Sequence, residues 1–389
     1  MKPFKKVAAF LLAAVMIALS AGCTPISFSK DWSYRYEDNE LAIGVYIYSL
    51  YQAYNQAQTY AQENEDYSSD KSFMDLAITD DDGNTEVAKT WILNEADKIT
   101  KRILAVDSEL KKNNITVDTA TMDEAKSTAE NIWEMGAYAA YGYFSPMSAE
   151  LEPYGISFDS FYISSYGAMA KESALFEGLY GKGGAKEVPE NEITDCFNEN
   201  YTDYKFFSVN LYTTETDDDG NSTNTALSDD EKKKVEDELK GYVNDIKSGK
   251  SYDDVLKTYM EANEITSDPS QSGTENLENS SIGDNIKEKL NEMKAGTAET
   301  LQVGEGNTAT LYFIYKGDTK KIADEYLSDN TNRSNVLSYM KQDEFNDYIE
   351  EVAKNLEVEK NQSQIDRYSP DMFFVPVEPT TTASTQDQA

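Results

Sequence analysis

Histidine is absent from this chain of 389 residues, and cysteine occurs only twice. Without histidine the chain can form neither a Ser-His-Asp or Cys-His nucleophilic site nor a histidine-ligated zinc site. The groups left for acid–base or nucleophilic chemistry are carboxylates, tyrosines, lysines and Cys196. Whole classes of hydrolase and metalloenzyme are thereby excluded, and the sequence indicates neither a metal nor a cofactor.

Positive charge is also scarce. The chain has 35 Lys and Arg against 71 Asp and Glu, which gives a formal net charge of −36 and a pI of about 4.3. Nucleic acids and anionic membrane surfaces would repel such a chain, so neither is expected as a partner. A solvated surface is the commonest role of such charge, and attraction of cationic clients is a weaker alternative. A carboxylate-pair hydrolase stays open as a class, but no pair stands out among so many acids.

Long apolar runs are confined to the start of the chain. Three lysines precede a run from Val7 to Leu19, which is short for a membrane span and is followed by Ala21-Gly22-Cys23. This order resembles a bacterial lipobox, whose cysteine is lipidated and becomes the mature N-terminus. We expect a lipoprotein signal peptide at 1–22 and lipid anchoring through Cys23 at the extracytoplasmic face of the cell membrane. Ordinary signal cleavage and a retained helix are the alternatives. A lipidated Cys23 leaves Cys196 without a disulfide partner.

Aromatic residues are plentiful, with 27 Tyr and 15 Phe, and they supply enough apolar surface for a folded protein. The length suffices for two or three domains. Apolar residues at spacings of three and four predict helices in most of the chain. The expected helical segments are 40–58, 88–113, 122–144, 157–180, 188–201 and 322–355. Two Asp-rich segments, 80–84 and 217–221, are expected to be turns.

A mixed segment extends from Tyr204 to Gly317. Aromatic and β-branched residues indicate its strands, and Ser228 with Glu231 forms an expected capping box. In order, the expected elements are a strand at 205–212, helices that begin at Ser228 and Ser251, a helix over 282–293, and strands around 301–303 and 308–316.

This order of elements, together with Lys294-Ala295-Gly296-Thr297 and the final strand, resembles a parvulin-type prolyl isomerase domain. Parvulin pockets usually hold one histidine in the first strand and one in the last, where this chain has Ser208 and Tyr312. The proline-binding positions of the third helix fall at Gly283 and Ile286. The resemblance implies a parvulin shape with a degenerate pocket, so whether the chain is an enzyme stays open.

The residues before this segment extend the resemblance. A helix that ends in Tyr180-Gly181-Lys182-Gly183-Gly184, followed by Val188-Pro189-Glu190 and then the strand, is similar to the PrsA/SurA extracytoplasmic foldases. The resemblance implies an α+β protein, in which N- and C-terminal segments form a mainly helical chaperone domain and a parvulin-like α/β module is inserted. The implied divisions are a signal peptide at 1–22, a linker at 23–39, an N-terminal helical domain at 40–203, the parvulin-like module at 204–318, a closing helical segment at 319–375 and a disordered tail at 376–389.

The leading hypothesis is a membrane-anchored chaperone that binds unfolded or partly folded secreted proteins and whose parvulin module is inactive. An active isomerase is one alternative. A solute- or glycan-binding lipoprotein is another, although that class usually alternates strands and helices around a parallel sheet. The sequence sets no oligomeric state. The candidate client-binding side chains are aromatic residues and one methionine on the N-terminal helices, where a place in the core is the commoner fate: Tyr138, Tyr141, Phe144, Phe161, Tyr166 and Met169.

Overall fold

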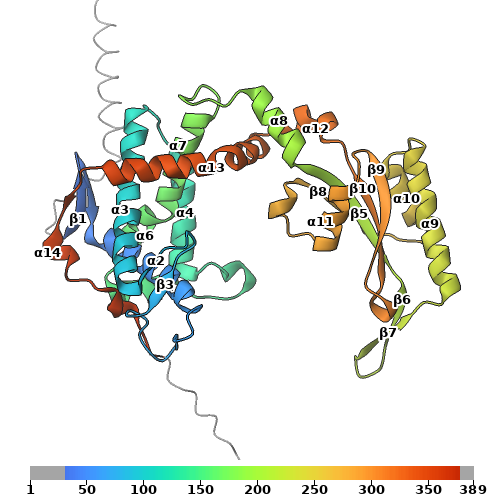
Figure 1. Ribbon diagram of the computed structural model, residues 1–389, viewed down its shortest axis with the longest axis horizontal. Helices are drawn as coiled ribbons and strands as arrows, with labels where there is room; N and C mark the ends of the chain where they lie inside the picture. Colours follow the sequence, from blue (N-terminus) through green and yellow to red (C-terminus); the bar gives the residue numbers. More distant parts are fainter. Residues whose placement is uncertain (1–30, 377–389) are drawn as a thin grey trace, which may run out of the picture. The chain divides into compact units, whose positions relative to one another are not determined.

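The computed structural model describes residues 31–376, which form a mixed α+β protein, as the sequence predicts (Figure 1). This part of the chain divides into two compact units. The first unit contains residues up to Lys186 and from Asp343 onward, and the second unit contains Glu187–Gln342. The expected signal peptide, Cys23 and residues 377–389 of the expected tail lie outside the described residues.

The first unit is mainly helical. Its C-terminal part begins within α13 (Asn330–Asn355), because the division between the units falls inside that helix. In chain order, its other elements are β1 (Trp32–Tyr36), β2 (Asn39–Ala42), α2 (Ile43–Ala61), β3 (Ala77–Thr79), β4 (Thr85–Val87), α3 (Ala88–Lys112), α4 (Thr119–Met135), α5 (Met147–Leu151), α6 (Phe158–Ser164), α7 (Tyr166–Tyr180), β11 (Glu359–Lys360), α14 (Gln362–Ile365) and the short 3-10 helix η5 (Pro370–Phe373).

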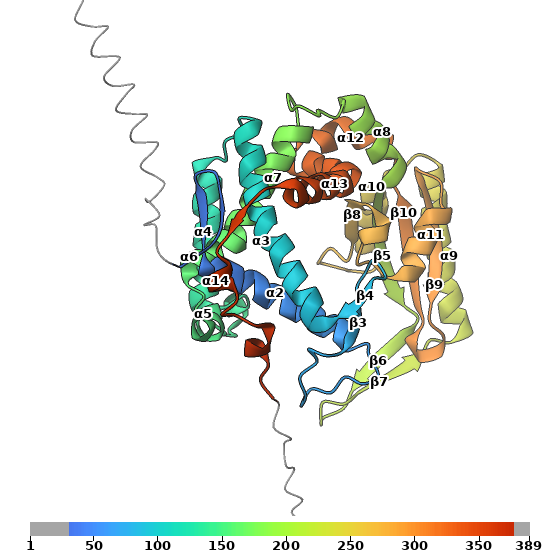
Figure 2. The same ribbon diagram turned by 60° about the vertical axis from the view of Figure 1, so that its left-hand side comes forward.

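Helix α2 is the centre of the first unit and packs against α3 and α6 (Figure 2). Its tyrosines are mostly core residues, because Tyr46, Tyr48 and Tyr54 are all buried. Burial raises the pKa of each of these three side chains to about 12. These three rings of the aromatic stripe therefore contribute to the core of the unit rather than to an open surface.

The later part of the segment expected as a linker at 23–39 belongs to strands, because residues 32–36 form β1 and β2 begins at Asn39. Trp32, Tyr34 and Tyr36 alternate along β1, as suits a strand, and Tyr34 is buried with its hydroxyl donating a hydrogen bond to Asp97. Strand β1 pairs with β2 on one side and with β11 on the other, with Tyr34 opposite Lys360. The two ends of the described chain therefore meet in one small sheet.

Two segments expected as continuous helices are interrupted. The helix expected at 122–144 ends at Met135, because Gly136 adopts a φ of +90°. The helix expected at 157–180 is broken at Ser165, where φ is −123° and ψ is −100°, and so becomes α6 and α7. The first interruption creates the loop described below.

The second unit is built on a four-stranded antiparallel sheet in the order β8-β5-β10-β9. The order predicted for 204–317, namely strand, two helices, polar stretch, helix and two strands, is present with two additions. The polar stretch contains strand β8, and the hairpin β6–β7, of which only the turn at 217–221 was expected, follows the first strand. The elements are α8 (Glu190–Asn200), β5 (Thr202–Asn210), β6 (Tyr212–Thr216), β7 (Ser222–Ala226), α9 (Asp229–Lys247), α10 (Tyr252–Ala262), β8 (Gln271–Glu275), α11 (Asp284–Glu292), β9 (Thr297–Val303), β10 (Thr310–Lys316) and α12 (Thr319–Ser328).

Successive side chains of a strand lie on opposite faces of the sheet, and each face of this sheet contributes to its own hydrophobic core. Phe207 and Phe313 lie on the face that packs against α9 and α10, whereas Phe206 and Ile314 lie on the face that packs against α11. The compact unit also includes α8 and α12, which the sequence-based divisions assign to the helical domain. The sheet thus presents two differently covered faces.

Candidate functional site

Four of the most exposed large apolar side chains of the described residues lie in the segment 136–145 between α4 and α5, which we call the aromatic loop. No charged residue occurs between Glu134 and Glu150, although 27% of the chain is charged. An exposed apolar surface of this kind is typical of an interaction site. The exposed fractions are 68% for Tyr138, 79% for Tyr141, 74% for Tyr143 and 69% for Phe144.

Backbone hydrogen bonds give the aromatic loop a defined shape. The Ser145 N–H donates to the carbonyl of Met135 at 3.1 Å and closes the base, while the Tyr141 and Tyr143 N–H groups donate to the carbonyl of Tyr138 at 3.0 and 3.2 Å. Glycine is required at position 136, since a Cβ there would lie 2.3 Å from the Ser145 carbonyl oxygen. Because the loop is already ordered, binding through its side chains loses little backbone entropy.

The predicted client-binding residues divide into an exposed group and a group that belongs to the core. Tyr138, Tyr141 and Phe144 lie together in the aromatic loop, and Met169 is exposed on α7. Phe161 is only 2% exposed, so the expectation that it contacts clients is corrected. Its ring lies 5.5 Å from those of Tyr48 and Trp133.

Tyr166 and Tyr143 differ in their exposure to solvent. Tyr166 is half-buried, with its ring 6.1 Å from that of Phe161, and belongs to the same core. Tyr143 is exposed in the loop but was not among the residues singled out from the sequence. The uncharged run that contains Tyr143 is the feature by which it could have been found.

The four parvulin-pocket positions lie on one side of the second unit's sheet. Ser208 and Tyr312 face each other across β5 and β10. Ser208 is exposed, and the ring of the half-buried Tyr312 lies 6.0 Å from that of Phe206. Ile286 is buried in the core beneath α11, and Gly283 is exposed at the start of that helix. These four positions thus carry an exposed hydroxyl, a half-buried phenol, a buried isoleucine and an exposed glycine.

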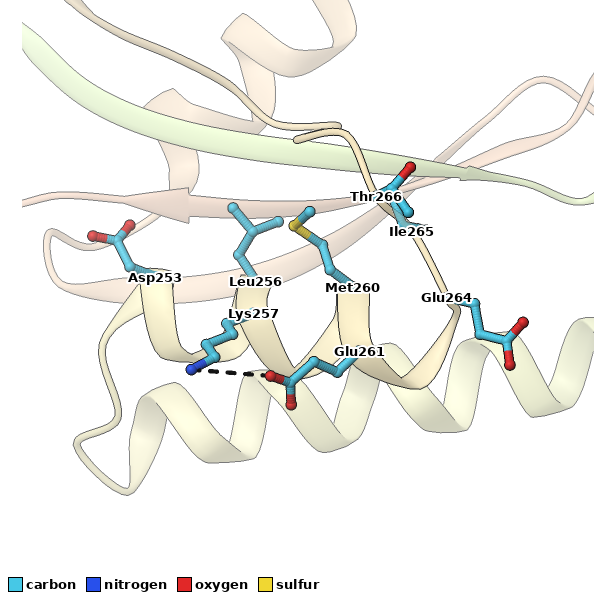
Figure 3. Close-up of a pocket in the computed structure, with 8 residues that line it drawn as sticks. All are labelled: Asp253, Leu256, Lys257, Met260, Glu261, Glu264, Ile265 and Thr266. Carbon is cyan, nitrogen blue, oxygen red and sulfur yellow. Dashed lines mark ion pairs between the residues drawn. The ribbon is translucent and has the colours of Figure 1, made fainter.

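A groove of about 480 Å³ follows α10 and the turn after it; we call it the α10 groove (Figure 3). Leu256, Met260 and Ile265 form its apolar part, and Figure 3 shows the carboxylates of Glu261 and Glu264 outside them. The groove residues are Asp253, Leu256, Lys257, Met260, Glu261, Glu264, Ile265 and Thr266.

A second hollow, of about 600 Å³, lies in the second unit beside the end of β10 and has a polar lining. The Lys316 ammonium group donates to the Leu290 carbonyl at 2.8 Å, and burial lowers the pKa of this lysine. Burial raises the pKa of Asp203, whose carboxylate accepts a hydrogen bond from the Thr274 hydroxyl at 3.1 Å. The polar groups of Lys316 and Asp203 are therefore already hydrogen-bonded within the protein. The lining also offers little apolar surface to a ligand.

Within residues 31–376, no group of three or more cysteine or carboxylate side chains is placed to hold a metal ion. Among the helices in the same range, none is both long enough and apolar enough to cross a membrane.

No family model and no curated protein matches the chain. Among solved structures, it is similar to the foldase protein PrsA from Streptococcus pneumoniae, with 12% identity over 76% of this chain and 98% of that chain and a TM-score of 0.33. It is also similar to PrsA from Bacillus subtilis, with 12% identity, coverage of 74% and 95%, and a TM-score of 0.27. Both proteins are foldases of the family that the sequence resembles.

Proposed function

We propose that this protein is a membrane-anchored extracytoplasmic chaperone that holds unfolded segments of secreted proteins on its aromatic loop. The observation that carries the proposal is the exposure of four aromatic side chains on one hydrogen-bonded loop that has no charged residue. A chaperone that holds unfolded chains needs accessible apolar surface and a scaffold that stays soluble while exposing it. The net charge of −36 supplies that solubility.

Tyrosine suits weak and broad recognition. Its ring offers a large rigid contact with few torsion angles to immobilise, and its hydroxyl lets the ring remain in water when no client is bound. The small residues between the rings, Ala139, Ala140 and Gly142, leave room for different client side chains. The aromatic loop therefore combines adaptable contact with a low ordering cost, as binding of many unrelated sequences requires.

Replacement of Tyr138, Tyr141, Tyr143 and Phe144 by serine is expected to weaken client binding by at least about tenfold. Loss of about 1.4 kcal/mol of contact energy already has this effect, and burying one aromatic side chain contributes about that much or more. The measurement is suppression of the aggregation of an unrelated, thermally unfolding protein, without ATP. The matched control replaces four exposed apolar residues outside the loop by serine, namely Val87, Leu93, Tyr339 and Val375. Equal protection by both variants and the wild type would refute the assignment of the loop.

The anchor is a separate part of the proposal and rests on the sequence before the described residues. Three lysines, a short apolar run and Ala21-Gly22-Cys23 support lipidation at Cys23. The Cys23→Ser variant is expected to be released from the membrane or to accumulate as an unprocessed precursor, whereas Cys196→Ser should remain anchored. Fractionation and N-terminal mass spectrometry measure both outcomes. A Cys23→Ser protein that is membrane-bound with a normally processed N-terminus would exclude this anchor.

We also propose that the parvulin-like module does not catalyse prolyl isomerisation. The barrier of about 18–20 kcal/mol must be lowered by a shaped, hydrogen-bonding pocket, and Ile286 instead packs into the core while Ser208 faces solvent. The protein should therefore not accelerate cis/trans exchange in a proline peptide followed by NMR. Clear catalysis that Tyr312→Ala abolishes would restore the active-isomerase alternative.

The structure gives little support to the alternative that the protein is a solute- or glycan-binding lipoprotein. Lipoproteins of that kind usually enclose their ligand between lobes built on parallel sheets. Every strand pair assigned between residues 31 and 376 is antiparallel. Specific tight binding of one sugar or peptide, without any protection against aggregation, would nevertheless favour that class.

A further inference from the structure

The α10 groove has an apolar floor that is built into the end of the helix. The Ile265 N–H donates to the Met260 carbonyl at 2.9 Å, so the chain turns back and places Ile265 beside the last turn of α10. Leu256, one turn earlier, is buried next to them. Met260 and Ile265 are half-buried, which leaves part of their apolar surface open to a ligand.

Three acidic side chains and one lysine border this floor. Glu261 lies 3.9 Å from Lys257, and Asp253 pairs with Lys205 at 2.8 Å. The Glu264 carboxylate forms no hydrogen bond or ion pair with any residue in the range 31–376. Glu264 therefore provides the rim with a negative charge that none of the described residues neutralises.

The placement of Glu264 is locally unfavourable. Its φ is +54°, a left-handed conformation that glycine adopts most easily and that commonly ends a helix. A negative charge at the C-terminal end of a helix is also opposed by the helix dipole. A glycine would suit this position better on both counts, so local folding does not explain the carboxylate.

We propose that the α10 groove binds a stretch of unfolded polypeptide in which a large apolar side chain is next to lysine or arginine. The floor accepts the apolar side chain, and the acidic rim is complementary to the positive charge beside it. The volume of about 480 Å³ lies in the range of small-ligand sites, about 300–1,000 Å³, so the groove suits side chains rather than a folded domain. The identity of this ligand, an unfolded client, rests on the proposed chaperone function. The groove itself belongs to the second unit, whereas the aromatic loop belongs to the first.

The two parts of the groove have different effects on binding. Exposed ion pairs contribute little affinity and are screened by salt, so the apolar floor provides most of the attraction. The charged rim discriminates between segments, because it favours basic neighbours and repels acidic ones. The groove is therefore expected to select among the apolar segments that an unfolded client exposes.

Calorimetric titration of the full-length protein with three short peptides tests this proposal. Lys-Leu-Lys-Leu-Lys should bind, Glu-Leu-Glu-Leu-Glu should not, and Lys-Ser-Lys-Ser-Lys reports general attraction to an acidic protein and should bind much more weakly. Met260→Ser should weaken binding of the first peptide, because it removes apolar surface from the floor without changing the charge of the groove. Glu264→Gln should weaken it about three- to tenfold, whereas Glu288→Gln, the same change at an exposed position on α11, should leave it unaltered.

Glu264→Gly separates binding from folding, since it should raise the thermal stability of the second unit while lowering affinity for the basic peptide. Binding of that peptide to the Glu264 and Met260 variants at wild-type affinity would overturn the proposal, as would equal affinity for the serine peptide. The aromatic-loop variant should bind the peptide normally. Normal peptide binding by a wild-type protein that protects no client would refute the proposed chaperone function and leave the groove assignment standing.

Discussion

Replacement of Phe373 by alanine is expected to lower the free energy of unfolding of the first unit by about 3–5 kcal/mol. The Phe373 ring is buried, with its centroid 5.5 Å from those of Tyr51 and Tyr54 and 4.9 Å from that of Tyr154. A domain is stable by only about 5–15 kcal/mol, so this one change removes a large part of the total. The cavity would open between α2 and the C-terminal segment.

Tryptophan fluorescence during chemical denaturation measures this effect, because all three tryptophans of the chain, Trp32, Trp91 and Trp133, belong to the first unit. The control is Val375→Ala, two positions along the same segment but exposed, which should change stability by less than about 0.5 kcal/mol. Indistinguishable unfolding curves for the two variants would show that the C-terminal segment does not dock as described.

The C-terminal segment is held by more than one kind of contact, and their magnitudes differ. Strand β11 adds to β1, and Lys89 pairs with Asp371 at 2.6 Å, but both members of that pair are largely exposed. Exposed pairs contribute about 0–1 kcal/mol. Burial of Phe373 and Ile365 in the core of the first unit therefore dominates the attachment of this segment.

Local patterns in the sequence identified the second unit well. The capping box was correct in both of its hydrogen bonds, because the Ser228 hydroxyl accepts from the Glu231 N–H and the Glu231 carboxylate accepts from the Ser228 N–H. The strand expected at 205–212 is present as β5, and Phe206 and Phe207 lie on opposite faces of its sheet. These features depend on residues that are close in sequence, which is why they could be read without the fold.

Features that depend on distant residues could not be predicted in the same way. Strand β1 is completed by β11 from the other end of the chain, so 23–39 resembled a linker when considered alone. The segment after Met135 is rich in alanine, a strong helix former, and only the positive φ of Gly136 ends the helix there. Phe144 and Phe161 are the same residue type, and tertiary packing alone makes one exposed and the other buried.

Replacement of Phe313 by alanine is expected to have a comparably large effect on the second unit, again about 3–5 kcal/mol. The ring is fully buried and lies 5.1 Å from that of Phe207, with Tyr242 of α9 and Tyr252 of α10 around it. It therefore joins the sheet to the two helices that cover this face. Its removal should loosen α10 and with it the α10 groove.

The functional consequence distinguishes the two proposed binding surfaces. Phe313→Ala should lose basic-peptide binding at temperatures that unfold the second unit, while protection of clients by the aromatic loop persists and the tryptophan-detected transition shifts little. Phe144→Ala is the matched variant, since it truncates the same side chain where it is exposed. It should leave stability within about 0.5 kcal/mol, keep peptide binding and reduce protection against aggregation. If both variants lose both activities together, the loop and the groove act as one site, and the assignment of separate roles to them is wrong.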